Sequence, residues 1–251
     1  MTVSAVVLTH NNEASIAAVL EGLKWCDERI LIDDFSTDDT LTRARAYNVK
    51  IVQRHIRDNF AAQRNAGLTE ARGDWVLFID SDEIVTNSLQ KEILKNIYTD
   101  HLSNAFYIKR KDFLFGRELT HGETAQAQFV RLAKRNSGLW SRRVHETWNI
   151  QNGPVATLST PLLHYPHTNV AQFLNQINWY STIHAEVLYA ERKRISFWLI
   201  LIYPAMKFIQ NYFLRLGFLD GTAGLISAVM MSFHSFLARG KMWELGKKKK
   251  Y

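Results

Sequence analysis

The sequence predicts an α/β domain, with a mostly parallel sheet covered by helices on both faces, and a C-terminal helical region that associates with membranes. Three observations predict this class. Strand-like apolar runs alternate with helix-like runs over the first hundred residues, as in parallel sheets with two covered faces. Polar, acid-rich clusters follow several of these strands. The last quarter of the chain combines apolar runs with a strong positive charge.

The first hundred residues predict four strands and four helices in alternation. The strands are the apolar runs 2–9, 29–33, 49–54 and 75–80. The helices are expected at residues 13–25, 39–47, 58–72 and 88–98. Ile16 and Leu20 lie on the same face of the first helix, and Asn12 is expected to cap its start. Gly73 is expected to end the third.

Beyond residue 100 the alternation stops. Residues 105–115, 128–133 and 155–164 read as strands without regular helices between them, which predicts a mixed or antiparallel extension of the sheet. Residues 169–194 read as a helix.

Composition limits the class and the compartment. The chain has 251 residues, of which 47% are hydrophobic and 22% charged, as in ordinary globular proteins. Cys26 is the one cysteine, so an intramolecular disulfide is impossible and a reducing compartment fits best. The first residues lack the pattern of a signal peptide. We therefore expect a cytoplasmic protein.

Three polar clusters follow the first, second and fourth predicted strands. They lie at residues 9–13, 33–38 and 80–83. In open parallel sheets, ligands bind in the crevice beyond the carboxyl ends of the strands. Each cluster alone is equally a helix cap or a turn, because Asn, Asp and Ser favour both. Three such clusters at one sheet edge favour a functional crevice.

Asp80 and Asp82 are the sharpest feature of these clusters. Two carboxylates two residues apart, just past a buried strand, suit a hard cation such as Mg²⁺ or Mn²⁺, with substrate phosphates completing its shell. The alternative is a solvated acidic turn that caps the next helix. Gly-rich phosphate loops are absent from the sequence, which argues against dehydrogenases and P-loop ATPases. A nucleotide would therefore be held by side chains and metal.

Four ordered motifs, at residues 9–13, 32–38, 63–67 and 74–83, resemble those of family 2 glycosyltransferases of GT-A fold. The likeness is closest to the bacterial lipopolysaccharide core β-1,4-glucosyltransferase branch. It covers residues 1–165 well and the C-terminal region more loosely. The resemblance implies a Rossmann-like sheet, a UDP-sugar donor and inversion at the sugar carbon.

The resemblance also implies roles for individual residues. Those assigned to the nucleotide sugar are Thr9, Asn11, Glu13, Asp33, Arg64 and Asp80. Asp33 would contact the base, and Arg64 would lie near the diphosphate. Asp80 and Asp82 would face the ribose and the metal, with Asp82 the surer ligand. Asp34 stands where the family often has Gly or Ser.

Glu146 is the candidate base. A single displacement needs a carboxylate to deprotonate the attacking hydroxyl, and the segment with His145 and Glu146 resembles the acceptor-side motif of the family. His145 is assigned as its catalytic neighbour or a diphosphate contact. The alternative pairs Glu146 with Arg142 or Arg143 on the surface. His164 is a further candidate for the metal, although a structural histidine is the commoner case.

The positive charge belongs to the last quarter of the chain. Residues 1–190 carry a net charge of −1, and residues 191–251 carry +8. Two uncharged stretches, 195–206 and 222–238, are shorter than the roughly 20 residues of a spanning helix. Their aromatic and cationic flanks favour helices that lie on an anionic membrane. The alternatives are core helices or a homo-oligomer interface. Nucleic acid is not expected, because no motif for it is present.

The sequence thus predicts a metal-dependent glycosyltransferase that moves a hexose from a UDP-sugar to a lipid-linked saccharide of the lipopolysaccharide inner core. Residues 1–168 form the expected catalytic domain, with a nucleotide-sugar half to about residue 100 and an acceptor half after it. Residues 169–251 form the basic helical region, placed peripherally on the inner face of the cytoplasmic membrane. The alternatives are another acceptor (a polysaccharide, lipid carrier or peptide) or a non-catalytic nucleotide-binding protein that docks on membranes.

Overall fold

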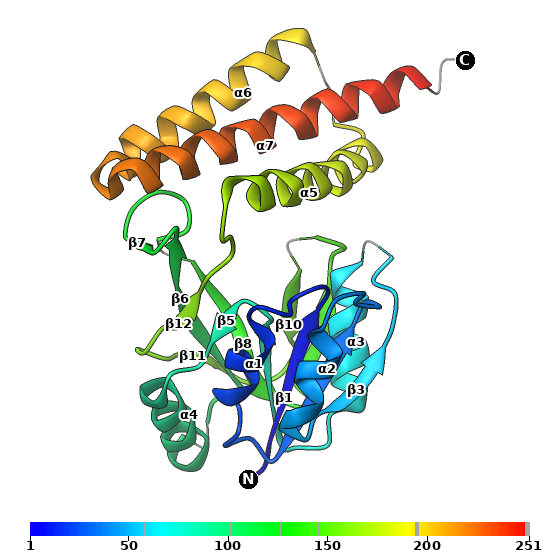
Figure 1. Cartoon of the computed structure of the whole chain (residues 1–251), viewed down its shortest axis with the longest axis vertical. Helices are drawn as coiled ribbons and strands as arrows, with labels where there is room; N and C mark the ends of the chain where they lie inside the picture. Colours follow the sequence, from blue (N-terminus) through cyan, green and yellow to red (C-terminus); the bar gives the residue numbers. More distant parts are fainter. Residues whose placement is uncertain (58, 101, 126, 145, 194–195, 249–251) are drawn as a thin grey trace. The chain divides into compact units, whose positions relative to one another are not determined.

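A computed structural model describes residues 1–57, 59–100, 102–125, 127–144, 146–193 and 196–248 (Figure 1). The chain forms two compact units. The first comprises Met1–Arg110 and Gln126–His164, and the second comprises Lys111–Ala125 and Tyr165–Tyr251. The predicted boundary at residue 168 lies close to the division after His164, and residues 111–125 also belong to the second unit.

The first unit is built on a parallel sheet whose strands are β1 (Val3–Thr9), β2 (Glu28–Asp33), β3 (Lys50–Gln53) and β4 (Trp75–Asp80). Their order is β3-β2-β1-β4. Thr9 pairs with Asp33, and Leu8 pairs with Asp80. The carboxyl ends of β1, β2 and β4 therefore meet at one edge, as predicted.

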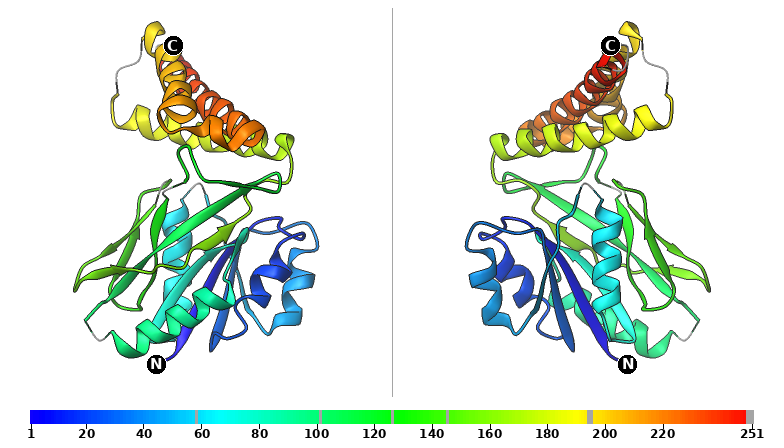
Figure 2. Two further views of the ribbon diagram at one scale, coloured as in Figure 1. Left: turned by 90° about the vertical axis from the view of Figure 1, so that its left-hand side faces the viewer. Right: turned by 90° about the vertical axis from the view of Figure 1, so that its right-hand side faces the viewer.

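Helices cover both faces of this sheet. They are α1 (Ile16–Glu21), α2 (Thr40–Ala44) with the 3₁₀ turn η1 (Arg45–Tyr47), α3 (Phe60–Glu70) and α4 (Asn87–Thr99). Alternate residues of β1 point to opposite cores: Val7 packs with α1 and α4, and Val6 packs with α3. Figure 2 shows α3 on the other side of the sheet from α1 and α2. The predicted fold class is confirmed.

Two local predictions are wrong. Asn12 does not cap α1, which starts later with Ser15 at its N-cap. The Oδ1 atom of Asn12 instead accepts hydrogen bonds from Thr9 Oγ1 and Ser81 Oγ. Gly73 does not end α3, which stops at Glu70. A Cβ at Gly73 would lie 2.7 Å from the backbone nitrogen of Ser4, so glycine is needed for close approach to β1.

The sheet continues as the predicted mixed extension. Its further strands are β5 (Glu83–Ile84), β6 (Ala105–Leu114), β8 (Gln128–Lys134), β11 (Val155–Thr157) and β12 (Leu162–His164). β8 is antiparallel to β4 and β6, and β11 is parallel to β6. The single strand expected at 155–164 is two strands, separated by a segment that contains Pro161. The hairpin of β9 (Gly138–Ser141) and β10 (Thr147–Ile150) was not predicted.

The second unit is mainly helical. It contains α5 (Val170–Ala190), α6 (Phe197–Ile209), the π-turn η2 (Gln210–Leu214), the 3₁₀ turn η3 (Gly217–Asp220) and α7 (Gly221–Lys248). α7 packs against both α5 and α6 and lies between them (Figure 1).

The segment 111–125, with β7 (Arg117–Leu119), belongs to this unit because it shares its core and its polar contacts. Leu114 and Leu119 are buried together with Phe173 of α5. The backbone nitrogen of His121 donates to the Asp220 carboxylate at 2.8 Å, and Lys207 Nζ donates to Glu123 at 2.6 Å.

The length of α7 bears on the prediction that neither apolar stretch is a good spanning helix. Within the described part of the chain, residues 217–247 form one helical segment long and apolar enough to cross a bilayer. Length and composition alone are weak evidence, because core helices of soluble proteins pass the same test.

Candidate active site

The three polar clusters lie together and are joined by hydrogen bonds. Ser81 Oγ donates to Asn12 Oδ1 at 2.7 Å, and Ser15 Oγ donates to the carbonyl of Ser81 at 2.6 Å. The backbone nitrogen of Asp34 donates to the carbonyl of Thr9 at 3.0 Å. The loops after β1, β2 and β4 therefore form one connected edge.

Asn11 and Glu13 brace the first loop against the second. Asn11 has a positive φ of 52°, a backbone conformation that Asn tolerates better than most residues. Its backbone nitrogen donates to Ser36 Oγ at 2.9 Å, and its Oδ1 accepts from the backbone nitrogen of Thr37 at 2.8 Å. Glu13 Oε2 accepts from the backbone nitrogen of Asp39 at 3.1 Å. These two candidates thus fix loop geometry, as Asx and turn residues do.

Asp33 is fully buried at the end of β2. Its carboxylate accepts from the backbone nitrogen of Ser36 at 3.0 Å and from Gln53 Nε2 at 3.1 Å. The neighbouring Phe35 stacks on His55 with the ring centroids 4.0 Å apart. The exposed aromatic stack offers the planar contact that a nucleobase needs, and the buried carboxylate of Asp33 holds the loop beside it.

Arg64 on α3 joins two of the predicted carboxylates. Its Nε donates to Glu146 Oε1 at 2.7 Å, and its Nη2 donates to Asp80 Oδ1 at 2.8 Å. The guanidinium also lies over the Trp140 ring, 4.7 Å from the centroid. Only 3% of the Arg64 side chain is exposed. Burial lowers the pKa of Arg64, but Asp80 and Glu146 outweigh burial and raise it above its ordinary value.

Arg131 on β8 is a member of the site that the sequence reading missed. Its Nη2 donates to Asp80 Oδ2 at 2.6 Å and to Glu83 Oε1 at 2.9 Å. Burial raises the pKa of Asp80, but Arg131 and Arg64, one on each oxygen, hold it well below its ordinary value. Burial raises the pKa of Glu83, which is fully buried, and Arg131 opposes this only in part. The available signal for this site residue was Arg131 itself, a charged residue between the apolar residues of a predicted strand.

Asp82 has a different environment from Asp80. Its Oδ2 lies 3.3 Å from His164 Nε2, which the antiparallel pairing of His164 with Glu83 brings alongside. Its Oδ1 is buried and has no hydrogen-bond partner among the residues that the structure describes. Clusters of three or more metal-binding side chains are not found in the described part of the chain. A cation at Asp82 would therefore need further ligands from substrate phosphates.

The structure thus brings Asp80 and Glu146 into contact with the same arginine, Arg64. Glu146 is 15% exposed and accepts from a buried arginine, which differs from the surface pairing that was the alternative. His145, assigned beside it, lies outside the described residues.

Known proteins that are similar to this chain are glycosyltransferases, as the sequence predicted. Residues 4–154 match the sequence model of the family described as "Glycosyl transferase family 2". An uncharacterised glycosyltransferase of Rickettsia typhi is 27% identical over 98% of this chain and 88% of its own. The lipopolysaccharide core biosynthesis glycosyltransferase LpsC of Rhizobium meliloti is 25% identical over 97% of this chain and 93% of its own.

Among solved structures, that of S. aureus TarS has a TM-score of 0.50 and 19% identity, and this chain covers 54% of it. A structure of TarS 1–349 in complex with UDP-GlcNAc has a TM-score of 0.50 and 17% identity, with 97% of this chain and 89% of that chain covered. At these identities the likeness establishes the GT-A fold.

Proposed function

The chain belongs to glycosyl transferase family 2, and on that premise we propose that it transfers a hexose from a UDP-sugar to the saccharide of a lipopolysaccharide inner core. Enzymes of this family use a nucleotide sugar as donor. The finer assignment of donor and acceptor rests on the site and on two relatives. LpsC is named for lipopolysaccharide core biosynthesis, and TarS 1–349 was solved with UDP-GlcNAc.

The observation that carries the proposal is the contrast between the two aspartates. Both oxygens of Asp80 accept from buried arginines, whereas Oδ1 of Asp82 is buried without a hydrogen-bond partner in the described chain. An unsatisfied buried carboxylate oxygen is costly unless a cation or a donor meets it. Asp82 therefore fits a divalent cation, with His164 holding its other oxygen.

Mg²⁺ or Mn²⁺ at Asp82 would supply neutralisation of the charge that develops on the diphosphate as its bond to the sugar breaks. Asp80 is already paired with Arg64 and Arg131, which neutralise its charge and weaken its attraction for the same cation. We assign Asp80 first to positioning these arginines. Thr9, Asn11 and Glu13 shape the adjoining loops, and Asp33 is assigned to the base.

Glu146 is proposed as the base of a single, inverting displacement. The acceptor hydroxyl oxygen bonds to the anomeric carbon, the bond from that carbon to the diphosphate breaks, and the hydroxyl proton passes to the Glu146 carboxylate. The short contact with Arg64 Nε fixes the position of this carboxylate. Arg64 also carries an Nη1 that is buried and has no partner in the described chain, which suits an anionic oxygen of the diphosphate.

A lipid-linked acceptor would place the enzyme peripherally on the inner face of the cytoplasmic membrane. The apolar C-terminal helix is in keeping with this placement but is weak support on its own.

A thermal-shift screen of nucleotides and UDP-hexoses, with and without Mn²⁺, tests the donor assignment. A ligand that binds only the folded protein raises Tm by mass action. We expect one UDP-hexose to give the largest shift, and Asp82→Asn to lose the part of that shift that depends on Mn²⁺. A larger shift with a nucleotide of another base would contradict the assignment of UDP.

A further inference from the structure

α6 presents an apolar surface that the rest of the described second unit does not cover. None of its residues is buried. Its large apolar residues that are exposed are Phe197, Trp198, Leu201, Ile202, Tyr203, Met206 and Ile209. A patch of this kind is rare on soluble monomers and marks an interaction surface.

The exposed residues form a stripe along one side of the helix. Trp198, Ile202, Met206 and Ile209 follow one another at spacings of three or four residues, so they share a face. Between 41% and 66% of each is exposed. Elsewhere on α6, the carbonyl of Pro204 accepts from Ser232 Oγ of α7 at 2.7 Å. α6 is therefore held by α7 while its apolar stripe remains open.

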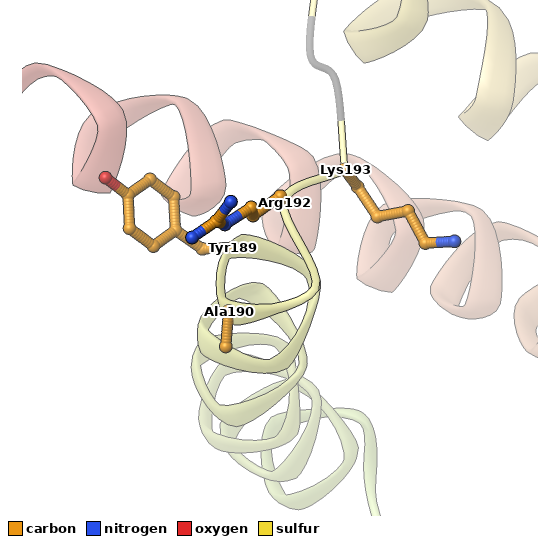
Figure 3. Close-up of a pocket in the computed structure, with 4 residues that line it drawn as sticks. All are labelled: Tyr189, Ala190, Arg192 and Lys193. Carbon is orange, nitrogen blue, oxygen red and sulfur yellow. The ribbon is translucent and has the colours of Figure 1, made fainter.

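The charge around this stripe is mostly positive, although Lys193 Nζ lies 4.0 Å from the Glu191 carboxylate and Lys207 Nζ lies 2.6 Å from that of Glu123. Residues 192–219 contain five Lys and Arg and no Asp or Glu. Arg192 and Lys193 are exposed just before α6, where they line an open hollow of about 540 Å³ with Tyr189 (Figure 3). Their side chains extend in different directions, so they do not form one closed anion site. This arrangement complements an extended anionic surface.

Two cation–aromatic pairs involve α7, and one of them joins it to Tyr203 of α6. The Arg239 guanidinium lies 3.8 Å from the ring centroid of Tyr203, and Lys247 Nζ lies 4.1 Å from that of Trp243. Tyr203 and Trp243 are both nearly half exposed. Trp and Tyr beside Lys and Arg are typical of the boundary between lipid headgroups and acyl chains.

α7 itself is held within the second unit. Lys241 Nζ donates to Ser181 Oγ at 2.9 Å and to Thr182 Oγ1 at 2.8 Å, both on α5. Met230 and Met242 of α7 are buried. A bilayer-spanning α7 would lose these polar contacts with α5.

We propose that α6 lies in the plane of a membrane that contains anionic phospholipid, with its apolar stripe at the acyl boundary and its cations on the headgroups, and that α7 does not cross. This inference extends the proposed function but does not depend on the identity of the donor or the acceptor.

The test is co-sedimentation of the full chain with vesicles of phosphatidylcholine alone or mixed with phosphatidylglycerol. We expect binding to the mixed vesicles and little binding to the neutral ones. The triple variant Trp198→Ser, Ile202→Ser, Ile209→Ser should bind the mixed vesicles about a hundredfold more weakly, because it removes three apolar side chains from the lipid contact. The matched control, Tyr98→Ser, Leu102→Ser, Leu139→Ser, removes exposed apolar residues of the first unit and should bind as the parent chain does.

A charge variant keeps the proposal open to refutation if the apolar variant fails to fold. Arg192→Gln, Lys193→Gln and Arg215→Gln should each weaken binding to mixed vesicles about fivefold, the effect of one cation near an anionic surface. The Tm of each variant without ligand reports whether it folds, and the rise in Tm on adding UDP reports donor binding. A folded chain whose Tm does not rise with UDP would count against the proposed function and not against this surface.

Three results would overturn the proposal. Equal binding of the parent chain and the apolar triple variant would remove α6 from the contact. A parent chain that binds no vesicle but dissociates from dimer to monomer in the triple variant would show that a second copy covers the stripe. Retention of the parent chain on vesicles through alkaline carbonate washing would show that α7 spans.

Discussion

At the scale of single residues, the candidate site depends on how two buried arginines share three carboxylates. Arg64 contacts Glu146 and Asp80, and Arg131 contacts Asp80 and Glu83. Removing one partner from such a group leaves an uncompensated buried charge, which costs more than the intact pair contributes. Asp80 therefore couples stability to site geometry, whereas Oδ1 of the Asp82 carboxylate has no hydrogen-bond partner among the described residues.

Arg131→Met is expected to lower the free energy of unfolding by about 3–5 kcal/mol at neutral pH, because it removes the arginine partner of the fully buried Glu83 and leaves Asp80 with Arg64 alone. Burial raises the pKa of Glu83. The ionised form of this carboxyl therefore destabilises the fold increasingly as the pH rises from the ordinary pKa of a Glu side chain towards the raised one. The deficit of the variant should therefore shrink in mildly acidic buffer. Urea denaturation at the two pH values measures it.

Arg135→Met provides the control, because Arg135 is an exposed cation four residues further along the chain. Its effect should stay within about 0.5 kcal/mol. A stable Arg131→Met protein with an unchanged urea midpoint would contradict the role given to Arg131.

At the scale of elements, strand and helix periodicity predicted the first hundred residues well. The apolar runs of β1 and β4 are buried almost throughout, so their patterns were strong. The short hairpin β9–β10 lacked such a pattern, since its residues alternate in burial over only four positions per strand. Asn12 was misread because a tertiary contact with Ser81 competes with helix capping, and capping rules are local.

Prediction of the candidate site was limited in the same way, because local patterns could be read and tertiary contacts could not. Asp80 and Asp82 were predicted at the sheet edge because sheet topology fixes where strands end. The partnership of Arg131 with Asp80 joins residues 51 positions apart, and periodicity carries no information about such a pairing. The sequence could not show which of the two carboxylates, Asp80 or Asp82, would accept hydrogen bonds from arginines.

Gly67→Ala tests the packing of α3 on the sheet. Helix propensity alone predicts that this change stabilises the protein by about 1 kcal/mol. A Cβ at Gly67, however, would clash with Cγ1 of the buried Val6. We therefore expect a loss of about 1–3 kcal/mol in the free energy of unfolding, measured by urea denaturation. A gain in stability would show that α3 sits further from β1.

Glu92→Gln tests the attachment of α4 to the segment before β12. The Glu92 carboxylate accepts from the backbone nitrogens of Ser159 and Thr160, both at 2.7 Å. Burial raises the pKa of Glu92, but these hydrogen bonds outweigh burial and lower it to about 2. Its contribution to stability is therefore complete above the ordinary value of 4.5 and is lost as pH falls through about 2.

At neutral pH Glu92→Gln should cost about 1–2 kcal/mol, a value reduced for the solvent around a half-exposed carboxylate. The difference from the parent chain should narrow between roughly pH 4.5 and pH 2. Lys91→Gln, on the exposed side of α4, serves as the control. A deficit that grows on acidification would have the wrong sign for this account.

At the scale of the whole molecule, the candidate active site and the surface proposed to bind membranes lie in different units. The described site residues all lie in the first unit, which also contains the parallel sheet. The apolar stripe and the cations around it lie in the second, and residues 191–251 carry a net charge of +8 against −1 for the rest. Variants of one unit should therefore leave the activity assigned to the other measurable.

The central claim is that Asp82 holds a cation against a diphosphate while Glu146 takes the proton of the acceptor. The most direct measurement is the release of UDP from UDP-hexoses by the parent chain, Asp82→Ala and Glu146→Gln over a titration of Mn²⁺. We predict Mn²⁺-dependent turnover in the parent chain, loss of the Mn²⁺ response in Asp82→Ala, and in Glu146→Gln a fall of about 10²–10⁴-fold in kcat with donor binding retained. Undiminished turnover in both variants would contradict the claim.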